Sequence, residues 1–152
     1  MISALTPIGK LKHLKKIKIA TSKISIKPAI QAEISKCSAK SVKIYHNSSG
    51  NSPFIKWLEK LDKNEQKLVN SKIRNYIENN FGVVKQLTLA PGVNELKIEC
   101  GPSYRIYFGI HREQKIILSG GLKKTQIRDI EKVSQYWSDF LKILNYLIEK
   151  PC

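Results

Sequence analysis

The sequence has few of the features that mark secreted, metal-binding or membrane proteins. Its three cysteines, Cys37, Cys100 and Cys152, are odd in number, widely separated and not in a CxxC pair. This usage argues against a disulfide framework and favours a reducing compartment. The three histidines are scattered and form no metal-ligand pattern. No apolar run approaches the roughly 18–20 residues that a membrane span requires. We therefore expect a cytoplasmic chain with no metal site and no segment inserted in a membrane.

The motifs of common catalytic sites are also missing. There is no glycine-rich phosphate loop of either usual spacing, no HExxH and no G-x-S-x-G. We therefore expect no cofactor, and any active site has to be assembled from side chains that no single motif brings together.

Basic residues dominate the composition. The 152 residues have a formal net charge of +15 at pH 7. Residues 1–41 hold nine lysines against the single acid Glu33, and residues 42–152 hold 18 Lys and Arg against 11 Asp and Glu. Both parts are basic, so polyanions are the expected partners, with nucleic acid first and an anionic membrane surface second.

The first 41 residues form a separate segment rich in Lys, Ser and Ile, and we place the domain boundary near Ser41. Three interpretations stay open. The segment is a disordered or loosely helical extension that adds nonspecific polyanion affinity, or it is no part of the working protein, as after an upstream translation start. The third is a targeting presequence, although such presequences prefer Arg and this one has none. Residues 42–152 then form one domain.

Apolar periodicity in residues 42–152 predicts the element order β-α-α-β-β-β-β-α. Ser52-Pro53 has the residues of an N-cap and first helical position, Asn80-Phe81-Gly82 marks a helix end, and Thr125 is the predicted N-cap of the last helix. The stripe of that helix comprises Ile127, Ile130, Val133, Trp137, Phe140, Leu141, Leu144 and Leu147. The predicted elements are strands at 42–46, 83–89, 93–100, 104–110 and 115–119 and helices from 53 to 61, from 65 to 79 and from 125 onward. The expected fold is α+β, with a helical hairpin and a long C-terminal helix packed on a small, mostly antiparallel sheet.

A β-hairpin is predicted between Val93 and Gly121. Apolar and polar residues alternate on both sides of a Gly101-Pro102-Ser103 turn, and the alternation puts Cys100 with the core positions. If the turn pairs Ile98 with Tyr104, the polar face carries two facing pairs, Lys97 with Arg105 and Glu95 with Tyr107.

Two cations directly opposite each other destabilise a sheet, so this pair suggests that an anion is held between them. Lys123 and Lys124 follow the next strand, after Gly120-Gly121, and we expect them to lie over the same end of the hairpin. The predicted phosphate site consists of Lys97, Arg105, Lys123 and Lys124, with Glu95, Tyr107, Gln126 and Arg128 nearby.

Such a cluster suits metal-free RNA cleavage. That reaction needs a group that accepts the 2′-OH proton, cations that stabilise the phosphorane-like transition state, and a group that protonates the departing 5′-oxygen. Glu95 or Lys97 is the candidate base, and Tyr107 or a lysine the candidate acid. The competing interpretation is structural, because a cation on the outer face of a strand commonly serves solubility and tyrosines commonly pack.

Three stretches together resemble the RelE/ParE toxin superfamily, in particular its HigB-like, phage-type addiction module killer branch. They are Asn94–Lys97, Gly101–Phe108 and Gly120–Ile130, and the likeness spans about residues 42–140. Lys97 stands where that branch usually has Arg, Ser103 replaces a Gly, and Leu122 replaces an Asp.

The resemblance implies a type II toxin that cuts mRNA in the ribosomal A site and is neutralised by a cognate antitoxin, of helix-turn-helix type in this branch. Arg105 matches the arginine that contacts the scissile phosphate in the family, and Lys123 matches a lysine of its last motif. The family's C-terminal tyrosine has no clear match, and Asp129 lies near its place. The alternative is a non-nuclease member, either a ParE-like gyrase poison or a relic that only binds its antitoxin or RNA.

Overall fold

The computed structural model describes residues 42–149, so the expectations for residues 1–41 lie outside the described part of the chain. Within it, three α-helices and a five-stranded mixed sheet form an α+β fold, which confirms the predicted class. The elements are β2 (Val42–Ile44), α3 (Pro53–Glu59), α4 (Lys63–Asn79), β3 (Val83–Gln86), β4 (Val93–Ile98), β5 (Tyr104–His111), β6 (Gln114–Leu122), the 3₁₀ turn η1 (Lys123–Thr125) and α5 (Gln126–Glu149).

The strands lie in the order β2-β6-β5-β4-β3, and every neighbouring pair is antiparallel except β2 with β6. That parallel pair makes the sheet mixed, and it is possible because α3, α4 and three strands separate β2 from β6 in the chain. Among residues 42–149, no helix has both the length and the apolar character needed to cross a membrane.

The predicted register of the central hairpin is correct. Ile98 pairs with Tyr104, so Lys97 lies opposite Arg105. The turn between them places Gly101 and Ser103 at positive φ, 56° and 61°. Cys100 lies beyond the end of β4 and is exposed, so its predicted place among the core positions was wrong.

Helix boundaries follow the caps. The Ser52 hydroxyl accepts a hydrogen bond from the Ile55 N–H and begins α3, as predicted. α4 begins at Lys63, two residues before the predicted start, because Asp62 and Glu65 form a reciprocal capping box. It ends where Asn80 adopts a left-handed conformation, as predicted.

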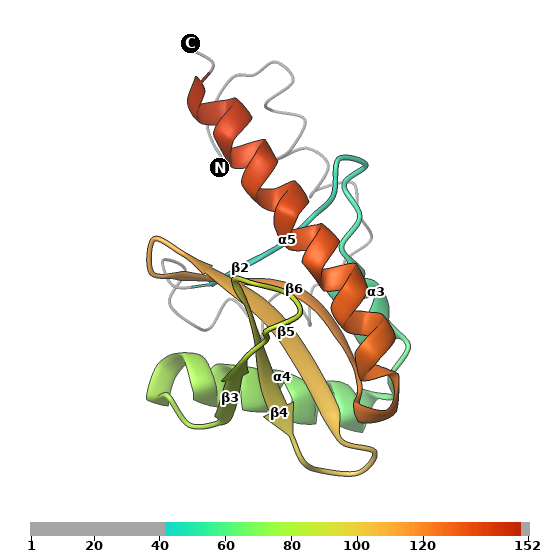
Figure 1. Ribbon diagram of the computed structural model, residues 1–152. Helices are drawn as coiled ribbons and strands as arrows, with labels where there is room; N and C mark the ends of the chain where they lie inside the picture. The colour runs from blue at the N-terminus through green and yellow to red at the C-terminus, as the bar shows by residue number, and fades with distance from the viewer. Residues whose placement is uncertain (1–41, 150–152) are drawn as a thin grey trace.

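Helices cover both faces of the sheet (Figure 1). On one face, α3 and α4 pack through residues such as Leu58 and Ile73 against Ile106 and its neighbours. On the other, α5 packs through Val133 and Trp137 against the second core cluster, and its C-terminal part continues beyond the sheet (Figure 1). The face of the hairpin that was predicted to be polar is therefore covered by α5.

The buried stripe of α5 begins one turn later than predicted. Ile130, Val133 and Trp137 are buried, but Ile127 is 78% exposed. Thr125 lies within η1 and directly precedes α5. Its hydroxyl donates to the Asp129 carboxylate, whereas an N-cap hydroxyl accepts a hydrogen bond from a backbone N–H of its helix. The first turn of the helix thus projects polar groups and Ile127 beside the hairpin.

Candidate functional site

Two rows of side chains cross the sheet beneath the start of α5. In the first row, consecutive partners across β3, β4, β5 and β6 are Val83, Lys97, Arg105 and Gly121, and in the second they are Lys85, Glu95, Tyr107 and Ser119. Since side chains two residues apart on a strand share a face, both rows lie on the α5 side of the sheet.

Glu95 is the buried centre of this arrangement. Its side chain is fully buried, and its Oε2 accepts a short hydrogen bond from the Gln126 amide at the start of α5. Its Oε1 lies 3.8 Å from Arg105 Nε and has no hydrogen-bond partner. A buried carboxylate is costly unless it is compensated, so Gln126 and Arg105 together hold it in place.

Arg105 is 3% exposed and is bound to protein groups on several sides. Besides the contact with Glu95, its Nη2 lies 3.4 Å from Glu99 Oε2, and its Nη1 donates a 3.0 Å hydrogen bond to the Tyr104 carbonyl. Carboxylates of the chain itself thus compensate Arg105, one member of the opposed Lys97–Arg105 pair. The expectation of an outer-face cation was wrong for Arg105, because α5 covers it.

Tyr107 is a buried tyrosine whose hydroxyl has no hydrogen-bond partner. Burial raises the pKa of its hydroxyl strongly, and the charges of Glu95 and Asp129 raise it further. The group therefore remains a protonated phenol at neutral pH, which is the form that a proton donor requires.

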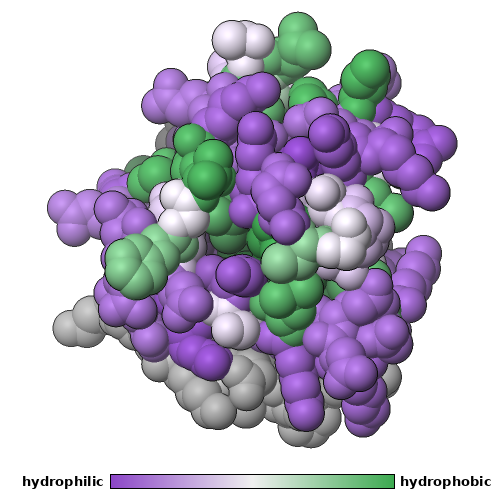
Figure 2. Space-filling view, turned by 90° about the horizontal axis from the view of Figure 1, so that it is seen from below, coloured by the Kyte–Doolittle hydropathy of each residue, from purple (hydrophilic) through white to green (hydrophobic). Residues whose placement is uncertain are grey.

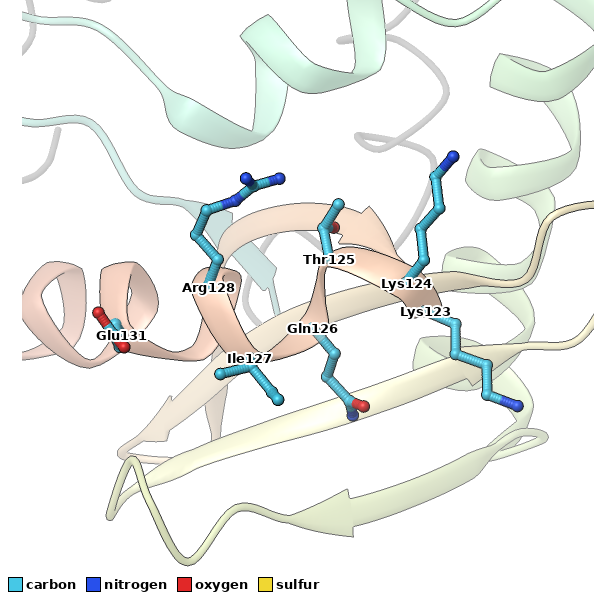
Figure 3. A pocket seen from close by; sticks show the side chains of 7 residues that line it. All are labelled: Lys123, Lys124, Thr125, Gln126, Ile127, Arg128 and Glu131. Carbon is cyan, nitrogen blue, oxygen red and sulfur yellow. The ribbon is translucent and has the colours of Figure 1, made fainter.

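The η1 turn and the first turn of α5 surround a hollow of about 420 Å³ (Figure 3). It is lined by Lys123, Lys124, Thr125, Gln126, Ile127, Arg128 and Glu131. A hydrogen bond from the Lys123 N–H to the Ser103 carbonyl, 2.9 Å, ties this turn to the hairpin.

The cations of this hollow point in different directions. Figure 3 shows Lys124, Thr125 and Arg128 directed to one side of the turn and Lys123 and Gln126 to the other, and Gln126 bonds Glu95 on the hairpin. Of the two lysines predicted to lie over the hairpin, only Lys123 points to the same side as Gln126, and Lys124 points away (Figure 3). The reason is that consecutive residues of a 3₁₀ turn diverge by about 120°.

The predicted set thus divides into two layers. Glu95, Arg105 and Tyr107 form a buried cluster with the amide of Gln126 above it, while the half-buried Lys97 and the exposed Lys123, Lys124 and Arg128 face solvent nearby. The surface cations suit binding of a phosphate backbone. A substrate that contacts Glu95 Oε2 has to displace the Gln126 amide.

Two residues near this cluster were missed as site residues, Glu99 and Thr125. Glu99 shares the alternation of Glu95 and Lys97, so the period-two pattern already placed it on the face of Arg105. Thr125 donates a 2.6 Å hydrogen bond to Asp129 Oδ2, and their spacing of four residues was the available signal. Within residues 42–149, no group of three or more His, Cys, Asp or Glu side chains is arranged to hold a metal ion.

Comparisons with known proteins identify no relative, since neither a scan of protein-family models nor a search of curated proteins produced a match.

Proposed function

We propose that this chain is the toxin of a type II toxin–antitoxin module and that it cuts translated mRNA as a ribosome-dependent interferase. The observation that carries the proposal is the direct opposition of Lys97 and Arg105 across β4 and β5, with the η1 turn of Lys123 joined to the same end of the hairpin. The basic composition and the three motifs that resemble RelE/ParE toxins support it as well.

The proposed reaction uses no metal. The 2′-oxygen attacks the adjacent phosphorus, the bond to the 5′-oxygen breaks, and a 2′,3′-cyclic phosphate and a 5′-hydroxyl result. Lys97 and Lys123 stabilise the added negative charge, and Arg105 does so once the substrate replaces one of its carboxylate partners. Glu95, freed from Gln126, accepts the 2′-OH proton, and Tyr107 gives its proton to the leaving oxygen.

A second candidate function is RNA or partner binding without cleavage, as in a ParE-like gyrase poison or a toxin relic. Arg105 favours it, because a guanidinium that is 3% exposed and engaged by Glu95 and Glu99 is not free to grip a phosphate. In this alternative Lys97, Lys123, Lys124 and Arg128 bind polyanion and the buried cluster is purely structural.

Primer extension on translated mRNA separates the two functions. The wild type should produce cuts in the ribosomal A site, and Lys97→Ala and Lys123→Ala should weaken them at unchanged stability. Lys72→Ala is the matched control, since Lys72 is an exposed lysine on α4. Absence of cuts from the wild type would exclude the nuclease, and equal cutting by all three variants would exclude Lys97 and Lys123 from its active site.

The proposal includes a cytoplasmic location and a cognate antitoxin, of helix-turn-helix type, that covers α5 or the cations beside it. The distal part of α5 carries exposed apolar surface, including Ile148, which suits such a partner. Coexpression of toxin and antitoxin should give an equimolar complex. If Lys97 reacts with an amine-labelling reagent equally fast in the complex and in the free chain, then the antitoxin does not act by covering the site.

A further inference from the structure

Phe81 is an exposed aromatic side chain in the link between α4 and β3, close in sequence to the row that contains Lys97 and Arg105. It is 69% exposed and lies two residues before Val83, which is 61% exposed and pairs directly with Lys97 on β4. Burial of a phenylalanine side chain contributes about 1.5–3 kcal/mol, and this contribution is largely unused at Phe81.

The backbone around Phe81 is fixed although its ring is not packed in either core. The N–H of Phe81 donates to the Asn75 carbonyl, 3.3 Å, and the N–H of Asn80 donates to the Tyr76 carbonyl, 2.9 Å, in the cap that ends α4. On its other side, Gly82 lies so close to the core that a Cβ there would come within 2.7 Å of Leu96. The ring is therefore presented from a rigid position, which lowers the entropy cost of using it in binding.

Strand alternation places the neighbours of Phe81. Val84 packs against the core on the α4 side, so Val83 and Lys85 point to the opposite face, where Lys97 and Arg105 lie. Figure 2, which views the molecule from below, shows apolar groups in separate clusters among mostly hydrophilic side chains. A ring on a positively charged edge matches the recognition of single-stranded nucleic acid, in which bases stack on aromatic rings and cations follow the backbone.

We propose that Phe81 is a stacking platform for one base of a single-stranded RNA whose backbone crosses Lys97 and Lys85. This proposal rests on the proposed function in its choice of RNA, and it extends the binding surface from the β4–β5 hairpin to the β3 edge. The charge on this edge favours RNA over a protein partner, whose contact surface would be depleted of lysine.

Fluorescence anisotropy at low salt tests the proposal with the full chain and no ribosome. The probe is a labelled single-stranded oligonucleotide with 2′-deoxyriboses, which cannot be cleaved by 2′-OH attack, and a second probe of equal length has abasic sites in place of the bases. Phe81→Ala should weaken binding of the first probe by roughly 5- to 100-fold and leave binding of the abasic probe unchanged. Phe81→Trp should retain the affinity for the first probe.

Leu89→Ala is the matched control, because Leu89 is 76% exposed in the loop between β3 and β4, at the other end of β3. It should change neither affinity. Equal loss of both probes in Phe81→Ala, no loss of either, or no binding of the first probe by the wild type overturns the proposal, and in the second case a protein partner becomes the better explanation for Phe81.

The outcomes remain distinct from those of the nuclease test. Base-dependent binding through Phe81 without A-site cuts would leave the stacking site and remove the nuclease. Cuts that require Lys97, together with identical probe binding by wild type and Phe81→Ala, would leave the nuclease and remove the stacking site.

Discussion

The Gln126 amide donates a short hydrogen bond to the buried carboxylate of Glu95, and this contact joins the first turn of α5 to strand β4. It closes the buried cluster from above, on the side of the hollow lined by the η1 turn. The same contact stabilises the fold and occupies Glu95 Oε2.

Replacement of Gln126 should destabilise the fold in a way that reveals the charge of its partner. Gln126→Ala removes a donor to a buried carboxylate, so we expect the free energy of unfolding to fall by about 1–3 kcal/mol. Gln126→Glu places a second carboxylate against Glu95 and should cost more than Gln126→Ala. Urea denaturation of both variants at pH 7 measures this, and a smaller cost for Gln126→Glu would contradict the contact.

Arg105→Ala should destabilise the protein by about 3–5 kcal/mol, because it leaves the buried Glu95 without its cation. Glu99→Ala should cost less than about 1 kcal/mol, since Glu99 is 56% exposed. Adding Glu95→Gln to Arg105→Ala should recover part of the loss in a double-mutant cycle. Additive losses would mean that the two buried residues do not interact, and any loss of cleavage in Arg105→Ala has to be judged against this stability.

Stability at alkaline pH should depend on Tyr104. Burial, followed by its 2.5 Å hydrogen bond to Glu65 and the charge of that carboxylate, raises the pKa of Tyr104 from 10.0 to about 12. The folded state keeps a proton that the unfolded chain releases near pH 10, so this stabilisation is complete below pH 10 and is lost as the pH rises toward about 12. Tyr104→Phe should lose stability less steeply than the wild type over this range in urea titrations, and identical slopes would refute the assignment.

Gly109→Ala should disturb the packing of α5 on the sheet. A Cβ at Gly109 would lie 2.4 Å from the Trp137 ring, which is itself buried between helix and sheet. We expect a loss of about 1–3 kcal/mol from overpacking, visible as a lower Tm. Ile110→Ala is the neighbouring control, because Ile110 is half exposed and should change the Tm little.

Local patterns in the sequence predict much of this fold correctly. The alternation around Gly101-Pro102-Ser103 predicts the pairing of Ile98 with Tyr104, and with it the opposition of Lys97 and Arg105, because a hairpin turn fixes the register. Ser52 and Asn80 mark helix boundaries for equally local reasons. The start of α4 was missed because the Asp62–Glu65 capping box looked like a break in the pattern.

The environment of the candidate site could not be predicted in the same way. Alternation says that Glu95, Lys97 and Arg105 share a face, but it does not say what covers that face. α5, more than 20 residues away in sequence, buries Glu95 and Arg105 and brings Gln126 onto them. The apolar stripe of α5 predicted a buried face without a partner, and its start was misplaced at Ile127 because apolar character does not report exposure.

The residue order decides the register of β4 and β5, the helix caps and the concentration of positive charge, since each depends on neighbours within a few positions. The burial of Arg105, the raised pKa of Tyr107 and the contact of Gln126 with Glu95 depend on how α5 crosses the sheet. These are tertiary properties, because the solvation and charge compensation of a group arise from atoms that are close in space and distant in the chain.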